Sequence, residues 1–424
     1  MEHIHSNNRR FGQFIFIGLA VLFERFSYYG SRSILALFMI GDGSGMGLSN
    51  ETALTYYSIF SAMMWIVAWP IGMLSDRKLG ISISPIAGAV LAFFGYLGLA
   101  LGGGGFLTVS LILIIIGDNL FRISIISQAA SFFPRQDRRR DGGLMVIYMF
   151  INFGAFLSTI GVGYVGEYFG FSWGFGICAL TMLLSLAFVL LNRYVFQYQY
   201  QAIHPQDQID QGLEATTIIQ RQKGRNKLIV IVALLGSLFW VLFEWLHMDV
   251  YEIGKDVYPS TLGGFWTNFY GGMLNALVVS GAILYFIVFW ILRQPGQVLS
   301  RLRLAFILLV PAALTLFSLG SSNQSWLMTG LVVQVVILSF AELFLTPLCL
   351  SWISRLAKPG FMSSMIGLYF TLAGGITTLI NFTVLELNVP TTVKAISGLI
   401  ISLVIIGLLI VRHQRINRLG HGID

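Results

Sequence analysis

Long apolar runs separated by short polar segments are the dominant pattern of this sequence. Twelve of these runs approach the roughly 20 residues that an α-helix needs to cross a lipid bilayer. They cover residues 11–40, 54–74, 81–101, 106–131, 144–162, 172–191, 228–247, 265–292, 304–319, 326–351, 362–384 and 395–411. The pattern therefore predicts an all-α membrane protein with 12 transmembrane helices.

A polar, glutamine-rich segment separates the first six predicted helices from the last six. We predict an N-terminal six-helix bundle over 1–195, a cytoplasmic linker over 196–226 and a C-terminal six-helix bundle over 227–424. This organisation resembles the major facilitator superfamily, in which the substrate site lies near the bilayer midplane between the two bundles.

The positions of lysine and arginine test this topology independently, because cytoplasmic loops collect positive charge. Of the 26 Lys and Arg residues, 21 lie in the termini and in alternate loops, whereas the opposite loops hold only Lys255 and Lys394. We therefore predict that both the N and C termini are cytoplasmic and that the chain lies in the inner (plasma) membrane. The same topology accounts for the net charge of +7, so the charge pattern does not indicate a nucleic-acid partner.

Composition agrees with a membrane protein and excludes a soluble domain. Only 11% of the residues are charged, against roughly 25% in soluble proteins. The two cysteines, Cys178 and Cys349, lie in apolar runs and are expected to be packing residues. Because the sequence has no nucleophile–base pair, metal-ligand cluster or phosphate-binding loop, we predict neither an enzyme nor a metal or organic cofactor.

Seven ionisable side chains fall inside predicted spans, where burial is costly unless the group faces a cavity or a partner. They are Glu24, Arg25, Arg32, Asp118, Arg122, Glu244 and Glu342. In the first span, Arg25, Tyr29 and Arg32 share one helical face. Such a face suits a substrate carboxylate or a gating carboxylate, because a guanidinium binds a carboxylate through two parallel hydrogen bonds. A purely structural ion pair is the alternative for this stripe.

The buried carboxyl groups are the candidates for proton uptake, because burial favours their neutral form. By this argument Glu24, Glu244 and Glu342 are the coupling candidates, although each also suits a static helix–helix contact. Asp118 and Arg122 lie one turn apart in the fourth span and are placed to neutralise each other.

Two segments of the first half resemble the proton-coupled oligopeptide transporter family of the major facilitator superfamily. FERFSYYGSRSILALF, at 23–38, is similar to the signature ExxERFxYYG with its following arginine. GDNLFRIS, at 117–124, together with IYMFINFGAFLS, at 147–158, is similar to the second signature of the family. Weaker matches in the second half are FWVLFE at 239–244, AELFLTPLCLS at 341–351 and MIGLYF at 365–370.

The resemblance implies a symporter that imports di- or tripeptides by alternating access, with the proton as coupling ion. It implies that Tyr29 and Arg32 hold the peptide carboxylate, that Asn152 contacts the peptide backbone and that Glu342 receives the amino group. Arg122 replaces the lysine of the family's fourth helix and is included among the substrate-binding candidates.

The resemblance also implies which groups couple protons and which act in gating. Glu24 and Arg25 belong to the coupling cluster, and Glu244 matches a seventh-helix acid that acts in coupling and extracellular gating opposite Arg32. The loop GMLSDRKLG, at 72–80, is similar to the superfamily signature between helices two and three. It makes Asp76 and Arg77 gating or structural candidates, and Asp118 is placed in the same group.

Two departures from the family pattern leave the cargo open. Val21 stands where the leading glutamate of the first signature is expected, and Arg122 replaces a lysine. The alternative is a transporter for another zwitterionic or carboxylate-rich metabolite, such as a siderophore or a modified amino acid, with export as an open direction. A transporter-derived receptor is a third hypothesis. The expected partners are a peptide or small molecule, protons and the lipid bilayer, and the expected state is a monomer.

Overall fold

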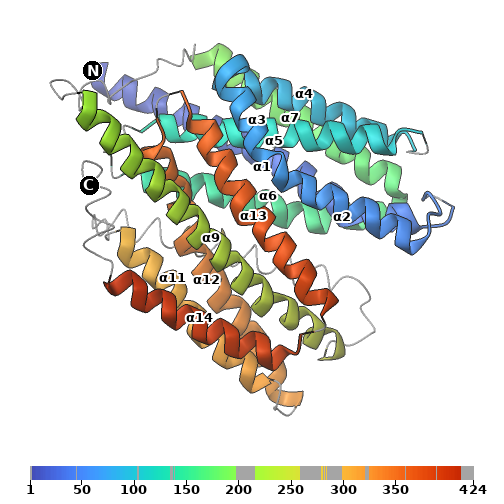
Figure 1. The fold of residues 1–424 in the computed structure, drawn as a ribbon. Coiled ribbons are helices and arrows are strands. Elements are labelled where there is room, and N and C mark those ends of the chain that lie inside the picture. Colours follow the sequence, from blue (N-terminus) through green and yellow to red (C-terminus); the bar gives the residue numbers. More distant parts are fainter. Residues whose placement is uncertain are drawn as a thin grey trace. The chain divides into compact units, whose positions relative to one another are not determined.

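In the computed structural model of the chain, the described residues are mostly helical (Figure 1). The structure describes residues 2–43, 45–102, 105–133, 137, 139–196, 215–257, 278–279, 281, 283, 298–319, 324–358, 360–387 and 389–411. The predicted linker falls largely outside these residues, and its last part, from 215 onward, already belongs to a helix.

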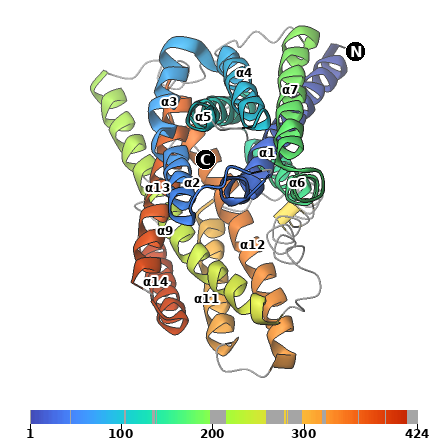
Figure 2. The same ribbon diagram turned by 90° about the vertical axis from the view of Figure 1, so that its right-hand side faces the viewer.

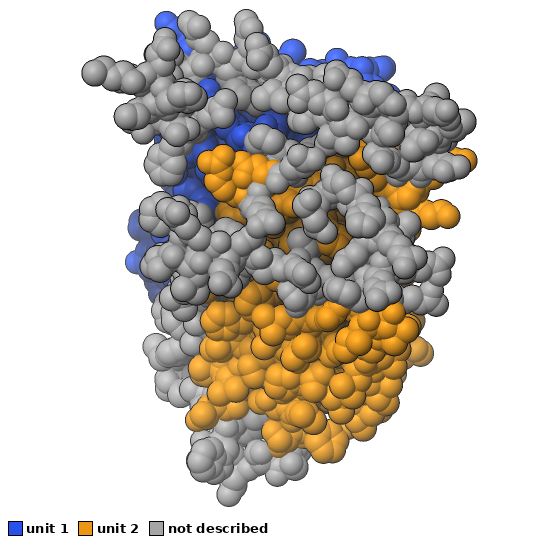
Figure 3. All heavy atoms as spheres, turned by 90° about the vertical axis from the view of Figure 1, so that its left-hand side faces the viewer, with its two compact units in different colours: residues 1–134, 146–205, 359–368 blue, residues 135–145, 206–358, 369–424 orange. Residues whose placement is uncertain are grey.

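The described helices divide into two compact units, which are coloured separately in Figure 3. Unit 1 contains residues 1–134, 146–205 and 359–368, and unit 2 contains residues 135–145, 206–358 and 369–424. Each unit therefore includes a short segment from the opposite half of the sequence. The predicted boundaries of the two six-helix bundles stay a prediction.

Unit 1 contains most of the first half of the chain. Its helices are α1 (Glu2–Ile40), α2 (Asn50–Ile66), α3 (Ala68–Leu74), the π-helical turn η1 (Ser75–Leu79), α4 (Gly80–Ala100), α5 (Leu107–Ser131) and α7 (Phe171–Phe196). Helix α6 (Arg139–Phe169) belongs to unit 1 from Val146 onward. The first turns of α13 (Met362–Glu386), as far as Leu368, complete the unit.

Unit 2 contains the other described helices. They are α9 (Ala215–Val257), α11 (Val298–Leu319), α12 (Gln324–Leu356), α14 (Thr391–Val411) and the remainder of α13. Helix α11 packs against α12 and α14, and α12 also packs against α9. The first turns of α6, through Met145, belong to this unit as well.

Helix α5 is the most enclosed element of unit 1. Figure 2 shows it nearly end-on among α1, α3 and α4, and every residue from Gly117 to Ala130 is buried. Glycines bring its neighbour α4 close: a Cβ at Gly88 would lie 2.6 Å from the carbonyl oxygen of Gly117. Small residues at such crossings are typical of helix packing in membranes. The ionisable residues of α5 are therefore held in a densely packed environment.

Helix α14 shows the opposite distribution. Small or apolar residues such as Gly398 and Ser402 face inward, whereas Ile400, Leu403 and Leu408 are more than half exposed. A helix with exposed branched aliphatic side chains suits a lipid environment rather than water. The outward face of α14 is accordingly apolar.

Nine segments among the described residues are long and apolar enough to cross a membrane. They are Ala68–Ala100, Leu107–Ser131, Arg139–Phe169, Phe171–Tyr194, Gln222–His247, Arg301–Ser318, Val332–Leu356, Met362–Val384 and Thr391–Val411. The prediction of an all-α, multi-pass membrane protein is confirmed, whereas the count of 12 spans stays a prediction.

Three of the predicted spans are not among the nine. The run 11–40 does form helix α1, but Glu24, Arg25 and the polar residues that follow them lower its hydropathy. The run 54–74 is interrupted at Val67, where α2 ends and α3 begins. The run 265–292 lies outside the described residues except for four positions.

Candidate functional site

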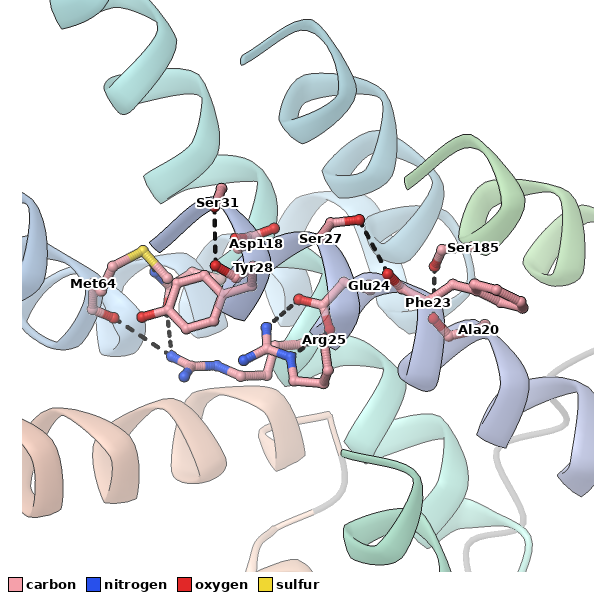
Figure 4. Close-up of polar contacts among 12 residues, drawn as sticks. Ala20, Phe23, Glu24, Arg25, Ser27, Tyr28, Ser31, Met64, Asp118 and Ser185 are labelled. Carbon is pink, nitrogen blue, oxygen red and sulfur yellow. Dashed lines mark hydrogen bonds and ion pairs between the residues drawn. The ribbon is translucent and has the colours of Figure 1, made fainter. Parts of the chain in front are cut away.

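Glu24 and Arg25 form a buried ion pair in the middle of α1. The Arg25 Nε donates to Glu24 Oε2 at 2.6 Å, and its Nη2 donates to Glu24 Oε1. Both residues are at most 2% exposed. The Arg25 guanidinium lies over the ring of Tyr28 at 4.7 Å (Figure 4). It also lies over the ring of Tyr29 at 5.8 Å. The pair is thus electrically neutral as a whole, and aromatic faces add cation–π attraction.

Arg32 has a different environment, although it lies only two turns further along α1. Its Nε donates to the Tyr57 hydroxyl at 3.0 Å, and its Nη1 donates to the Tyr28 hydroxyl at 3.4 Å. The side chains of Arg32 and Tyr57 are both half-buried. Within the described residues, both hydrogen-bond partners of Arg32 are therefore neutral phenols. This guanidinium keeps the capacity to bind a carboxylate.

Asp118 and Arg122 lie one turn apart on α5, as predicted, but their hydrogen bonds lead to other residues. The Tyr96 hydroxyl donates to Asp118 Oδ2 at 2.7 Å. Arg122 Nη2 donates to Asn119 Oδ1 at 2.9 Å and to the Met64 carbonyl oxygen at 3.4 Å. Neutralisation of one by the other stays a prediction.

Asn152 is buried on α6, with 4% of its surface exposed. Its Nδ2 donates to the Tyr148 carbonyl oxygen one turn earlier, at 2.9 Å. A contact to a substrate backbone would therefore use the Oδ1 atom or require this internal hydrogen bond to open. The role predicted for Asn152 is untested.

Two further predicted residues belong to unit 2. Glu244 is half-buried on α9, and Glu342 is 7% exposed on α12. One turn after Glu244, His247 stacks on Phe243 with 5.8 Å between the ring centroids. The site residues of the first half lie in unit 1, so the expected pairing of Glu244 with Arg32 stays a prediction.

Asp76 caps the first turn of α13 inside unit 1. Its Oδ1 accepts from the Ser363 backbone N–H at 3.1 Å, and its Oδ2 accepts from the backbone N–H and the hydroxyl of Ser364 at 2.6 and 2.7 Å. A carboxylate at this position satisfies free helix-start amides and complements the helix dipole. Arg77 follows Asp76 in η1. Gly72 permits the approach, because a Cβ there would lie 2.4 Å from the Ser363 carbonyl oxygen.

Sequence reasoning missed an ionic cluster in unit 2. Asp141, at the start of α6, accepts from Arg355 Nη2 at 2.6 Å and from the Ser351 hydroxyl at 2.5 Å, and Arg301 lies 3.8 Å away. All three charged side chains are at most 9% exposed. The basic residues were counted only as loop charges. The available signal was Asp141 itself, an acid directly after three consecutive arginines, 138–140.

Aromatic partners were also missed. Tyr57 bonds Arg32, Tyr96 bonds Asp118, and Trp65 lies under the Arg122 guanidinium at 5.1 Å from its ring centroid. Tyr57 lies near the start of the predicted span 54–74, where aromatics commonly anchor a helix at the bilayer interface, and Trp65 lies in the middle of that span. No local pattern distinguishes that role from a bond to a buried charge on another helix.

Part of the chain matches a known protein family. The PTR2 model, which describes the POT family, matches residues 86–244. A peptide transporter of Yersinia enterocolitica is 30% identical over 305 residues, which cover 70% of this chain and 55% of the relative. The chain belongs to the POT family.

Other POT-family relatives agree with this assignment. A di-/tripeptide transporter of Lactococcus lactis is 28% identical over 326 residues, covering 73% of this chain and 59% of the relative. The chain thus spans little more than half the length of these curated relatives. The relatives named by function are transporters.

Solved POT structures share the fold over nearly the whole chain. A peptide transporter POT in complex with sulfate has a TM-score of 0.68 and 22% identity, covering 96% of this chain and 95% of its own. A POT family transporter in complex with a thioalcohol-conjugated peptide has a TM-score of 0.70 and 21% identity, covering 95% of this chain and 96% of its own. At this identity the likeness concerns the fold.

Proposed function

We propose that the chain is a proton-coupled symporter that imports di- or tripeptides, or closely related compounds, by alternating access. Family membership supports this function, since relatives are named as peptide transporters. The proposed topology has 12 spans in two six-helix bundles, with both termini in the cytoplasm and the chain in the inner membrane. The lopsided distribution of Lys and Arg supports this orientation.

The observation that carries the substrate proposal is the contrast between two arginines of α1. Arg25 is already neutralised by Glu24, whereas the described hydrogen bonds of Arg32 go to the phenols of Tyr57 and Tyr28. A half-buried guanidinium held by neutral groups can accept an anionic ligand without first breaking an ion pair. We therefore assign Arg32, with Tyr29 nearby, to the substrate carboxylate.

The other assignments follow the family resemblance. We propose Asn152 as the contact to the peptide backbone, Arg122 as an additional anion contact and Glu342 as the acceptor of the amino group. Glu24, Arg25 and Glu244 are proposed for proton coupling, with Glu244 opposite Arg32 in the extracellular gate.

A second candidate cargo is a zwitterionic metabolite without a peptide bond. A POT family transporter of the same fold was solved in complex with 5-aminolevulinic acid, which carries an amine and a carboxylate. Val21 and Arg122, which depart from the family pattern, favour keeping this alternative. A carboxylate clamp at Arg32 serves either cargo.

The test reconstitutes purified protein in liposomes with an inward proton gradient. Lumen acidification is followed while dipeptides, tripeptides, amino acids and carboxylate siderophores are added one class at a time. Acidification with short peptides supports the symporter, and acidification with another class alone identifies the second cargo.

Two variants then test the clamp. Arg32→Ala should abolish uptake, because alanine cannot hold a carboxylate, while the protein level stays normal. Arg193→Ala is the matched control, since Arg193 is an exposed arginine near the end of α7. Retained uptake in Arg32→Ala would exclude the clamp.

A further inference from the structure

The first helix lacks one ionisable group that the family pattern leads us to expect. Val21 lies one turn before Arg25, is 2% exposed and cannot bind a proton. The remaining acid of this helix, Glu24, uses both carboxylate oxygens to bind Arg25. If protons are coupled to substrate through α1, a carboxyl group of a neighbouring helix has to carry the proton.

Asp118 on α5 is such a carboxyl group. It is 0% exposed, and its Oδ2 accepts one hydrogen bond, from the Tyr96 hydroxyl of α4. Its Oδ1 is buried and has no hydrogen-bond partner within the described residues. An ionised carboxylate has about four acceptor sites, and leaving them unfilled in an apolar interior is expensive. A proton on Oδ1 removes the charge and most of this cost.

The groups around Asp118 make its proton sensitive to the charges of α1. Glu24 and Arg25 of α1, Arg122 of α5 and Tyr96 of α4 all act on Asp118 electrostatically. Cys178 of α7 feels the Asp118 charge as well. Glu24 opposes ionisation of Asp118, whereas the two arginines favour it.

This arrangement links the proton to the ion pair of α1. When Asp118 is protonated, Glu24 is the only acid of this cluster that attracts Arg25. When the proton leaves to water, the Asp118 carboxylate competes with Glu24 for the same guanidinium. The charge state of Asp118 therefore changes the balance of forces on Arg25, which lies two turns before Arg32 on α1.

We propose that Asp118 is the proton-carrying carboxyl group of this chain and replaces the acid missing at position 21. The proposal rests on the proposed symport function. It assigns a proton-binding role to a residue that the sequence analysis placed among gating or structural groups.

The first experiment reads the proton directly and does not depend on the cargo. Infrared difference spectra of the full chain in lipid, recorded against pH, should show the C=O band of a buried protonated carboxyl group. Asp118→Asn should remove that band, and Glu24→Gln should shift its appearance to lower pH, because the charge of Glu24 opposes ionisation of Asp118. A band that is unchanged in Asp118→Asn would overturn the proposal.

The second experiment measures transport. With one proton per neutral substrate, a gradient of one pH unit sustains about tenfold accumulation. Asp118→Asn should lose this accumulation yet keep counterflow exchange of substrate. The double variant Val21→Glu with Asp118→Asn should regain accumulation, because it restores an acid one turn before Arg25. Full accumulation in Asp118→Asn alone would refute the role.

The two experiments separate failure of this inference from failure of the proposed function. If no compound in the panel is transported but the carboxyl band titrates and depends on Asp118, the cargo assignment is wrong and the proton site stands. If peptides are accumulated equally by the wild type and Asp118→Asn, the symporter stands and the Asp118 assignment is wrong.

Discussion

Two aspartates connect segments from opposite halves of the sequence, one in each unit, and they do so by different means. In unit 1, Asp76 binds only neutral donors, the two backbone amides and one hydroxyl at the start of α13. In unit 2, Asp141 binds the guanidinium of Arg355 and lies 3.8 Å from that of Arg301. The first contact is a helix cap, and the second is a buried ionic cluster.

The difference predicts unequal consequences when either acid is lost. Without Asp76, the amides that lose their acceptor are polar but uncharged. Without Asp141, two guanidiniums that are at most 9% exposed lose their acid. Removing one partner of a buried ion pair costs more than removing a cap, because the remaining charge stays desolvated.

Each contact lies within one compact unit, although its partners come from opposite halves of the sequence. Residues 135–145 of the first half belong to unit 2, and residues 359–368 of the second half belong to unit 1.

The largest expected effect is that of Asp141→Ala, which should lower the free energy of unfolding by about 3–5 kcal/mol. Thermal unfolding of the purified protein in detergent measures this change. The control is Asp137→Asn, because Asp137 pairs with Arg139, whose side chain is 80% exposed, and should cost at most about 1 kcal/mol. Equal effects of the two variants would show that the Asp141 cluster is not a significant stabilising contact.

A second variant separates charge from packing at the same cluster. In Asp141→Ala with Arg355→Leu, the principal partner of Asp141 is removed with it, so less charge stays buried without an acid. This double variant should recover a large part of the lost stability. If it is less stable than Asp141→Ala, the damage comes from lost packing, not from the uncompensated guanidinium.

Sequence reasoning located the helices better than the contacts between them. Hydrophobic runs identify α4, α5, α7 and α11 because lipid and core both require apolar side chains along the whole helix. The break at Val67 depends on packing between distant segments. The same is true of the placement of 135–145 in unit 2 and of 359–368 in unit 1. The hydrophobic pattern of a single helix carries no information about such packing.

The same limit applies to the candidate site. The stripe of Arg25, Tyr29 and Arg32 follows from helical spacing, so it could be predicted. Which arginine is neutralised could not, because Glu24 and Arg25 are consecutive residues, and helical spacing does not predict a contact between them. Tyr96 lies 22 residues from Asp118 and has no local signal as its partner.

The next effect concerns the packing beside the Asp76 cap. Gly367→Ala should lower the free energy of unfolding by about 1–3 kcal/mol, since its Cβ would lie 2.4 Å from the Ala68 carbonyl oxygen and the backbones would have to move apart. Gly375→Ala, on the same helix, has no atom within 4 Å of the new Cβ and should be neutral or slightly stabilising. Thermal unfolding measures both changes. If Gly367→Ala lowers the stability and Gly375→Ala does not, the close backbone approach at Gly367, rather than the loss of a glycine, causes the destabilisation.

The smallest effect is expected at the cap. Asp76→Ala should cost about 0.5–2 kcal/mol, the usual range for a lost helix cap, and Asp76→Asn should cost less because one side-chain oxygen still accepts from the amides. Thermal unfolding measures both changes, with Ser364→Ala reporting the share of the hydroxyl bond alone. Because the donors of this cap are neutral whereas Asp141 binds the charged Arg355, Asp76→Asn should be mild and Asp141→Asn severe. If the two asparagine variants cost the same, the distinction between a dipolar cap and an ionic cluster fails.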